Sequence, residues 1–218
     1  MNKLTRTIIG LSIFTFFNTH MISQETTSSS SNLVPKFGAR GGLNLATLST
    51  ENAQDNILVG FDLGLFAKLP ITKYFAFQPE VNFSMKGAKV DYNNIFVTGS
   101  AKYIFNYLEV PVLGVINLTD NLSIQGGPYF AYLLSGSTKN DATNNLFDFE
   151  NSINPDNYNR LDIGAAIGAS INIERIGLGI RYSRGFSTIG KESTVSNTSI
   201  RFPDAINSVL NLNVAISF

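Results

Sequence analysis

The feature of the sequence that most constrains its fold is an alternation of apolar and polar residues with a period of two. In the segment Phe75–Lys86 (FAFQPEVNFSMK), every odd-numbered residue is apolar, whereas the even-numbered residues include Glu80 and Asn82. Successive side chains of a β-strand point to opposite faces, so this segment predicts a strand with one apolar and one polar face. Its length is close to the roughly 9–11 residues of a strand that crosses a lipid bilayer.

The alternation recurs along the chain and predicts an all-β fold. Short turns are expected at Pro70–Lys73, Leu118–Asn121 and Glu174–Arg175, and long polar loops at 47–58, 88–104, 136–159 and 187–207. The predicted strands are Phe37–Leu45, Phe61–Leu69, Phe75–Lys86, Tyr107–Asn117, Leu122–Leu134, Leu161–Ile173, Ile176–Phe186 and Leu210–Phe218.

An even number of strands with alternating short and long connections is typical of bacterial outer-membrane barrels, whose short turns are periplasmic and whose long loops are extracellular. The sequence therefore predicts an eight-stranded antiparallel transmembrane up-and-down β-barrel in the bacterial outer membrane, with both termini in the periplasm. Its expected partners are outer-membrane lipid and, during insertion, the barrel-assembly machinery. The C-terminal aromatic residue, Phe218, is expected to take part in membrane insertion.

With the exception of Arg184, the charged residues of the predicted strands fall on the polar faces, four positive and four negative. A soluble ligand-binding barrel needs an apolar interior and could not bury these charges without filling its cavity with ion pairs. We therefore expect a charged lumen that is plugged by its own ion pairs, and we expect Arg184, which points to lipid, to lie near an interface. The predicted lumen network is Arg40, Asp62, Lys68, Glu80, Lys86, Glu109, Asp162 and Arg181.

Three prolines fit a closed barrel less well. Pro79, Pro111 and Pro128 lie inside predicted strands, where each removes a hydrogen-bond donor from the ladder. A closed barrel has no free edge at which a missing donor costs nothing. We therefore expect bulges or strand ends at these positions.

The residues before the first predicted strand have the composition of an export signal. Lys3 and Arg6 give a positive start, and the apolar run Ile8–Phe17 (IIGLSIFTFF) is shorter than the roughly 20 residues of a membrane helix. We expect a signal peptide over residues 1–23, a flexible periplasmic tether over the polar residues 24–35, and the barrel domain over residues 36–218.

The composition excludes several kinds of chemistry. The chain has no cysteine, which rules out disulfides, thiolate metal sites and a cysteine nucleophile. Its single histidine, His20, lies beside the expected cleavage site, so no histidine is expected in the mature chain. The formal net charge is zero, which provides no basic field for nucleic acid. We expect no cofactor and no resident metal.

Six stretches of the expected mature chain form a recognisable series: GARGGLNLA (38–46), GFDLGLFAKLP with FAFQPEVNFSMKGAK (60–89), NYLEVPVLG (106–114), GGPYFAYLLSG (126–136), LDIGAAIGA (161–169) and IRYSRGFSTI (180–189). With them the sequence resembles the PorT-like outer-membrane β-barrel family of the Bacteroidota. The resemblance implies an eight-stranded outer-membrane barrel in which the three prolines belong to the family segments. The founding member is tied to protein secretion, but the resemblance defines a scaffold rather than an activity.

The leading functional hypothesis is a non-enzymatic barrel that acts through its outside loops and rim in binding, envelope integrity or assembly, with an envelope or secretion protein as partner. The alternative is a small pore or transport barrel. An eight-stranded interior is just filled by side chains, which argues against a wide diffusion pore. Two further hypotheses stay open. One is a membrane-embedded hydrolase that uses Glu80 and Glu109 as an acid–base pair. The other is an ion port in which Asp148, Glu150 and Asp156 bind Ca²⁺.

Overall fold

The computed structural model of the 218-residue chain describes residues 33–49, 56–93, 98–142, 149–153, 158–190, 192–195, 198–201 and 205–218. The expected signal peptide and most of the expected tether lie outside these residues. Residues 32–218 form one compact unit. In the part of the chain that the structure describes, no helix is long and apolar enough to cross a membrane.

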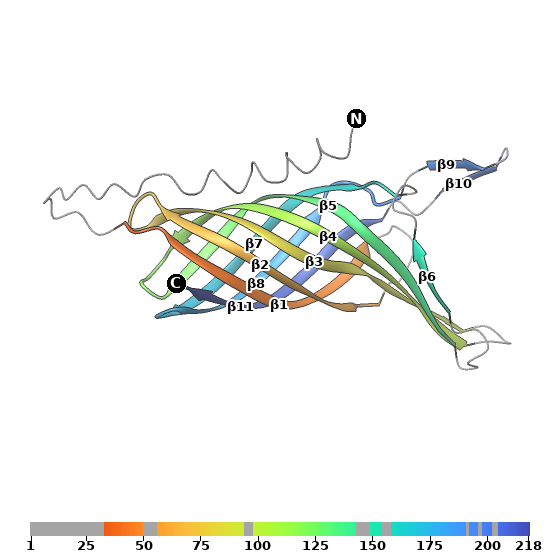
Figure 1. Ribbon diagram of the computed structural model, residues 1–218, viewed down its shortest axis with the longest axis horizontal. Coiled ribbons are helices and arrows are strands. Elements are labelled where there is room, and N and C mark those ends of the chain that lie inside the picture. Colours follow the sequence, from red (N-terminus) through yellow and green to blue (C-terminus); the bar gives the residue numbers. More distant parts are fainter. Residues whose placement is uncertain are drawn as a thin grey trace, which may run out of the picture. The chain divides into compact units, whose positions relative to one another are not determined.

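Eight long strands form a closed antiparallel barrel (Figure 1). They are β1 (Lys36–Ser49), β2 (Leu58–Pro70), β3 (Phe75–Asn93), β4 (Thr98–Asn117), β5 (Leu122–Ala142), β7 (Leu161–Ile173), β8 (Ile176–Gly185) and β11 (Ile206–Ser217). Each barrel strand pairs with its neighbours in chain order, and β1 pairs with β11 to close the ring. This up-and-down topology confirms the predicted fold class.

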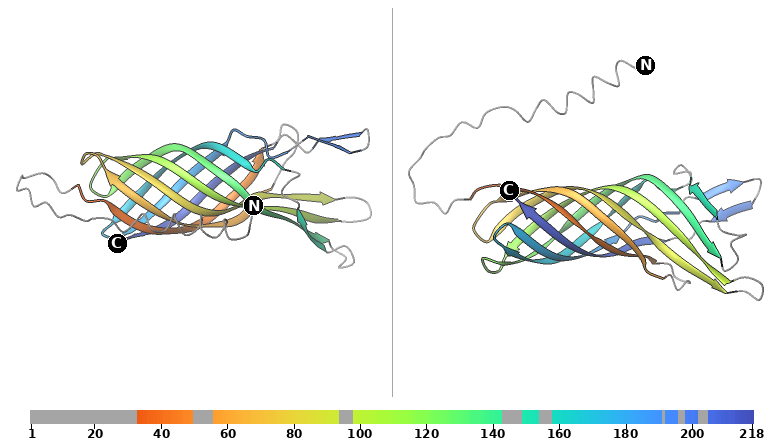
Figure 2. Two further views of the ribbon diagram at one scale, coloured as in Figure 1. Left: turned by 45° about the horizontal axis from the view of Figure 1, so that its top comes forward. Right: turned by 60° about the horizontal axis from the view of Figure 1, so that its bottom comes forward.

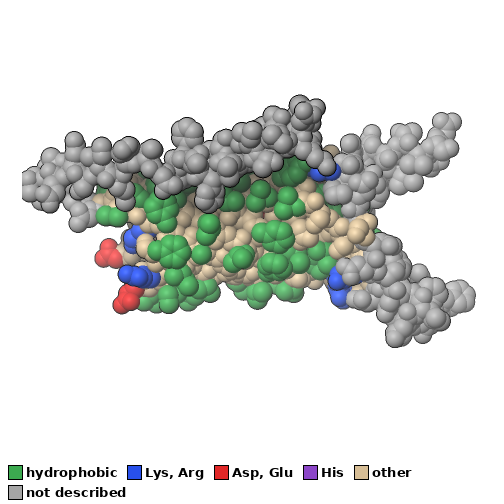
Figure 3. Space-filling view, in the orientation of Figure 1, with side chains coloured by type: hydrophobic (Ala, Val, Ile, Leu, Met, Phe, Trp, Pro, Cys, Tyr) green, Lys and Arg blue, Asp and Glu red, His purple; other side chains and the backbone are tan. Residues whose placement is uncertain are grey.

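Exposure alternates along the strands as the period-two pattern predicts. In β7, Asp162 is 2% exposed and Ala166 is 5% exposed, whereas Ile163 is 41% exposed and Ile167 is 67% exposed. Hydrophobic side chains cover the outer wall between the two ends of the barrel (Figure 3). This outward apolar belt, with polar residues inside, is the arrangement of a barrel that meets lipid on its outer surface.

Two of the short turns share one local design. In each turn, Ile71–Tyr74 and Leu118–Asn121, a threonine hydroxyl accepts hydrogen bonds from backbone N–H groups two and three residues later. The acceptors are Thr72 and Thr119. Such a hydroxyl stabilises a tight turn through hydrogen bonds to residues of the turn and the one that follows it, with no contribution from the rest of the protein. The third turn is only two residues long and has Glu174 at a φ of 53°. The turns thus lie within one residue of their predicted positions.

The strands β3, β4 and β5 continue into segments that were predicted to be loops. Residues 86–93 of β3 pair with 98–105 of β4, and residues 99–106 of β4 pair with 135–142 of β5. A short strand, β6 (Phe149–Ile153), adds to β5. We call these paired segments the extended sheet; it projects past the ends of the other barrel strands (Figures 1 and 2).

The prediction of loops at 88–104 and 136–159 is therefore wrong over the extended sheet. Its residues mix polar and apolar side chains, and apolar ones such as Ala88 and Phe105 are buried on the inward face. The outward apolar face that marked the strands therefore stops while the backbone ladder continues. The predicted loop 187–207 also contains regular structure, because β9 (Glu192–Val195) and β10 (Thr198–Arg201) form a separate two-stranded sheet.

The three strand prolines interrupt the hydrogen-bond ladders without shifting the register. The β2–β3 ladder pauses beside Pro79, the β3–β4 ladder beside Pro111 and the β4–β5 ladder beside Pro128. A register shift of the β4–β5 pair lies elsewhere, between Asn106 and Tyr107. The expectation of bulges or strand ends at the prolines is therefore wrong, and each strand runs straight through its proline with a donor missing.

The close approach of β2 to β3 gives a test of the packing. A Cβ atom at the inward-facing Gly64 would lie 2.5 Å from the carbonyl oxygen of Val81, whereas a Cβ at the outward-facing Gly41 would lie 3.5 Å from the nearest atom, on Leu63. Gly64→Ala is expected to lower the free energy of unfolding by about 1–3 kcal/mol, and Gly41→Ala by much less. Urea titration of the barrel in lipid vesicles measures both, and equal losses would contradict this packing.

Candidate functional site

The charged side chains predicted to face the lumen form two groups inside the barrel. The arginine–carboxylate cluster consists of Arg40, Asp62, Glu80 and Arg181, and the lysine–carboxylate cluster of Lys86, Glu109 and Asp162. All seven side chains are buried, with exposed fractions of 1% to 6%. Seven ionisable groups are thus removed from solvent within one narrow barrel.

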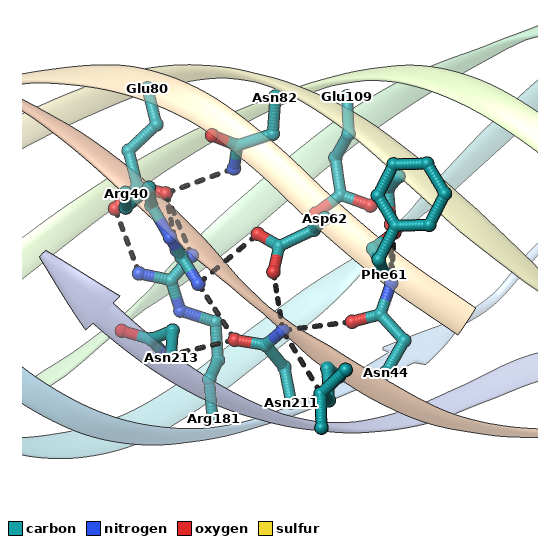
Figure 4. Close-up of polar contacts among 12 residues, drawn as sticks. Arg40, Asn44, Phe61, Asp62, Glu80, Asn82, Glu109, Arg181, Asn211 and Asn213 are labelled. Carbon is teal, nitrogen blue, oxygen red and sulfur yellow. Dashed lines mark hydrogen bonds and ion pairs between the residues drawn. The ribbon is translucent and has the colours of Figure 1, made fainter. Parts of the chain in front are cut away.

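Glu80 of β3 is the centre of the arginine–carboxylate cluster (Figure 4). Arg181 of β8 donates from Nη1 to Oε2 and from Nη2 to Oε1 of Glu80, both at 2.7 Å. Arg40 of β1 donates from Nη1 to Oε2 of Glu80, also at 2.7 Å. The two-pronged contact with Arg181 is the strongest geometry for a guanidinium and a carboxylate. It joins two strands that are not neighbours in the sheet and so fills the lumen between them.

Amide side chains complete the hydrogen bonding of this cluster. Asn211 of β11 accepts from Arg40 Nη2 at 2.7 Å and donates to Asp62 Oδ1 at 2.6 Å. Arg40 Nη2 also lies 3.4 Å from Asp62 Oδ2. Gln78 and Asn82, neighbours of Glu80 on the same face of β3, donate to its two carboxylate oxygens at 2.8 and 3.0 Å. Two arginines therefore face two carboxylates, and the group is electrically balanced.

The lysine–carboxylate cluster lies further along β3, which carries Lys86, and its two carboxylates come from β4 and β7. Lys86 Nζ is 2.5 Å from Glu109 Oε2 and 3.5 Å from Asp162 Oδ2. Its ammonium group also lies 4.5 Å from the centre of the Tyr129 ring, close enough for a cation–π contact. Tyr129 donates its hydroxyl hydrogen bond to Asp162, and Asn207 donates to Asp162 Oδ2 at 2.8 Å. One cation here faces two carboxylates, which leaves one excess negative charge. The hydrogen bonds that Tyr129 and Asn207 donate to Asp162 stabilise it.

An apolar layer lies beyond the lysine–carboxylate cluster, toward the extended sheet. Phe105, Leu133 and Ile189 are buried together in one hydrophobic cluster, and the ring of Tyr158 meets Phe105 edge to face at 5.3 Å between centroids. Ile189 follows β8 and is held inward by Asn159, whose side chain donates to the carbonyl oxygens on both sides of it, at Thr188 and Gly190. We call this layer the apolar cap.

Two predicted site residues lie apart from both clusters. Lys68 is half-buried and donates to Asn117 Oδ1 at 2.9 Å. It therefore contacts an amide, which is not the carboxylate partner expected in a shared charge network. Phe218 is 75% exposed, and its backbone N–H donates to the Phe37 carbonyl at 2.8 Å, which ties the C-terminus to β1.

The structure does not bring together the two glutamates of the suggested acid–base pair, and it describes only one of the suggested calcium ligands. Glu80 and Glu109 belong to different clusters, where arginines hold the first and a lysine holds the second. Among the residues that the structure describes, no group of His, Cys, Asp and Glu side chains is arranged to hold a metal ion. Of the suggested calcium ligands, Asp148 and Asp156 lie outside the described residues and Glu150 belongs to β6.

Sequence reasoning missed the uncharged members of the site. They occupy the same inward positions as the charges, so the period-two pattern could have found them, but it carries no information on which amide meets which charge. These uncharged partners are Asn44, Gln78, Asn82, Tyr107, Gln125, Tyr129, Asn207 and Asn211.

A closed ring of eight antiparallel strands with an apolar outer wall and a charged interior defines an integral outer-membrane β-barrel protein. The sequence agrees with this class. Residues 23–190 match the family described as the outer membrane protein beta-barrel domain, and the chain belongs to that family. No curated protein sequence matches the chain.

Several solved outer-membrane proteins have similar folds at low sequence identity. Ail of Yersinia pestis, solved in complex with the heparin analogue sucrose octasulfate, is 12% identical, with 84% of this chain and 99% of that chain covered and a TM-score of 0.49. Neisserial surface protein A is 14% identical, with 84% and 97% covered and a TM-score of 0.47. The outer membrane protease OmpT of Escherichia coli is 10% identical, with 84% and 79% covered and a TM-score of 0.45.

The arginine–carboxylate cluster predicts a large difference between two glutamate variants. Glu80→Gln leaves the buried guanidinium groups of Arg40 and Arg181 without their shared anion, which is expected to cost about 3–5 kcal/mol of unfolding free energy. Glu174→Gln, in the exposed two-residue turn, is expected to change it by less than about 0.5 kcal/mol. Urea titration in lipid vesicles compares the two, and a Glu80 variant as stable as the Glu174 variant would show that the ion pairs do not support the barrel.

Proposed function

We propose that this protein is a non-enzymatic outer-membrane barrel with a closed lumen, which acts through the end that carries its long connections. We call this the long-loop end. The observation that supports the proposal most directly is the burial of seven charged side chains in mutual contact across the barrel interior. An eight-stranded barrel has room for side chains and little else, and here that room is occupied.

The packing of the interior supports a structural plug over a conduction pathway. A conducting pore needs water along its axis, whereas Glu80 and Lys86 are each 1% exposed and the apolar cap lies beyond them. Charges in water would keep their hydration, but these replace it with hydrogen bonds of 2.7 Å. Such fixed pairs are costly to separate because each leaves its partner charged and buried.

The absence of an enzymatic role is inferred from the same contacts. A general acid or base must present its proton-transferring atom to a substrate. Both carboxylate oxygens of Glu80 accept hydrogen bonds from arginine, and Glu109 lies against Lys86. We therefore assign these glutamates to holding the barrel together.

We propose that the long-loop end faces outward and that both termini lie in the periplasm. The lengths of the connections support this orientation, since outer-membrane barrels place short turns in the periplasm and long loops outside. The extended sheet lies at the same end and gives it ordered backbone for contact with other molecules. Binding, envelope stabilisation or assembly at this end is the function that follows.

We also propose that the chain is a PorT-like member of its family from a bacterium of the Bacteroidota. A signal peptide would direct its export to the outer membrane. The support is the ordered series of sequence stretches and the basic, apolar start of the chain. A secretion or envelope protein is then one class of partner for the long-loop end. The proposal of a closed lumen does not depend on this assignment.

The closed lumen is tested by electrical recording. The purified protein in a planar lipid bilayer is expected to give no steady single-channel conductance, because two charged clusters and the apolar cap fill its interior. Folding of the same sample is checked by the faster gel mobility of the unboiled protein, so that a lack of conductance caused by misfolding is not taken as a closed lumen. A large, steady conductance from folded protein would overturn the proposal in favour of a pore.

The orientation is tested by tag accessibility on intact cells. An epitope tag inserted between residues 143 and 148 is expected to bind antibody on intact cells, whereas a tag in the turn Leu118–Asn121 is expected to bind only after the outer membrane is permeabilised. The two insertions serve as controls for each other because both lie in connections between strands. The reverse pattern would show that the barrel is inserted the other way round.

A further inference from the structure

Three lysines lie in one row across the extended sheet. Lys89 of β3 is the direct cross-strand partner of Lys102 of β4, and Lys102 is the direct partner of Lys139 of β5. Directly opposite residues in antiparallel strands have Cβ atoms about 4.5–5.5 Å apart, so the three lysines are close neighbours. We call this set the lysine row.

The lysine row lies on the outward face of the barrel wall. The preceding cross-strand pair, Ala88 and Tyr103, faces inward, since Ala88 is 1% exposed and Tyr103 packs against the apolar cap. Adjacent residues of a strand point to opposite faces, so Lys89 and Lys102 point outward. Lys139 shares their face because directly paired residues lie on the same side of a sheet.

This outward face continues the lipid-facing wall. Nearer the membrane belt on β4 and β5, Leu108 is 42% exposed and Leu134 is 46% exposed. Basic side chains lie at the long-loop end of the molecule, where the hydrophobic surface stops (Figure 3). Arg160 adds to them, because it donates a hydrogen bond at 3.1 Å to the hydroxyl of the exposed Tyr132.

Acidic residues lie beside the row or beyond it. Glu150 of β6 is the cross-strand partner of Lys139, and Asp91 and Asp141 follow the row by two residues along β3 and β5, toward the strand tips. The sheet thus places its lysines nearest the lipid and most of its acids further out. An anionic headgroup at the edge of the belt meets the positive charge first.

We propose that the lysine row binds the phosphate groups of anionic lipids in the leaflet around the long-loop end. Each ammonium group can donate charge-assisted hydrogen bonds to phosphate oxygens, and three neighbouring cations suit a headgroup with more than one phosphate. The choice of leaflet rests on the proposed orientation, whereas binding of lipid phosphate does not. Such binding fixes how deep the barrel sits and recruits a phosphorylated lipid shell.

The test compares thermal stability in two kinds of vesicle. The purified chain is folded into phosphatidylcholine vesicles that contain either lipid A with both phosphates or lipid A without phosphates. The wild-type midpoint of heat unfolding is expected to be about 6 °C higher with the phosphates. The triple variant K89Q/K102Q/K139Q is expected to lose this difference. Because each protein is compared with itself in the two kinds of vesicle, any change in the variant's own stability cancels.

A matched control removes positive charge from the other end of the barrel. The variant K36Q/K73Q, at the start of β1 and in the first short turn, is expected to keep the wild-type difference between the vesicles. Equal losses in both variants would mean unspecific attraction and would overturn the proposal. Wild-type binding of a sulfated oligosaccharide in solution, without a phosphate-dependent shift, would assign the row to a soluble polyanion and also overturn it. Because the vesicles carry lipid phosphate at both ends of the barrel, the thermal shift does not depend on which way the barrel is inserted. An inverted barrel would therefore change only the result of the tag experiment.

Discussion

The constraint on which the rest of the structure depends is that every backbone donor and acceptor inside a lipid bilayer needs a partner within the protein. A sheet meets this demand only when its first and last strands pair, as β1 and β11 do from Gly38–Ser217 to Ser49–Ile206. Closure with eight strands leaves an interior as wide as its own side chains. The inward-facing charges therefore share one narrow space, and their pairing follows from the closure of the ring.

Within that space, the buried charges connect parts of the wall that the backbone ladder does not. Glu80 joins β3 to β1 and to β8, neither of which is its neighbour in the sheet. Buried ion pairs are not in themselves more stabilising than well-packed apolar groups, because desolvation offsets most of their attraction. Their effect here is geometric, since two-pronged contacts fix which side chains meet and leave the lumen filled. The same wall contains three prolines whose strands keep their register.

The two ends of the barrel differ in structure. At the short-turn end, strands are joined by short turns with local hydrogen bonds, such as those accepted by Thr72 and Thr119. The long-loop end carries the apolar cap, the extended sheet and the lysine row. Under the proposed function, the long-loop end is the part of the barrel that contacts other molecules.

The sequence by itself determined the fold class, the inward or outward face of nearly every strand residue and the positions of the short turns, because each is encoded by neighbours within a few residues. It did not determine the ends of β3, β4 and β5, since these segments mix polar and apolar residues and lack the regular outward apolar face that marked the other strands. The partners of the buried charges were decided only by the tertiary structure. Arg181 and Glu80 are 101 residues apart in the chain, and their contact depends on closure and register around the whole ring. The lysine row has the same origin, because three lysines far apart in sequence become neighbours only when three strands pair in one register.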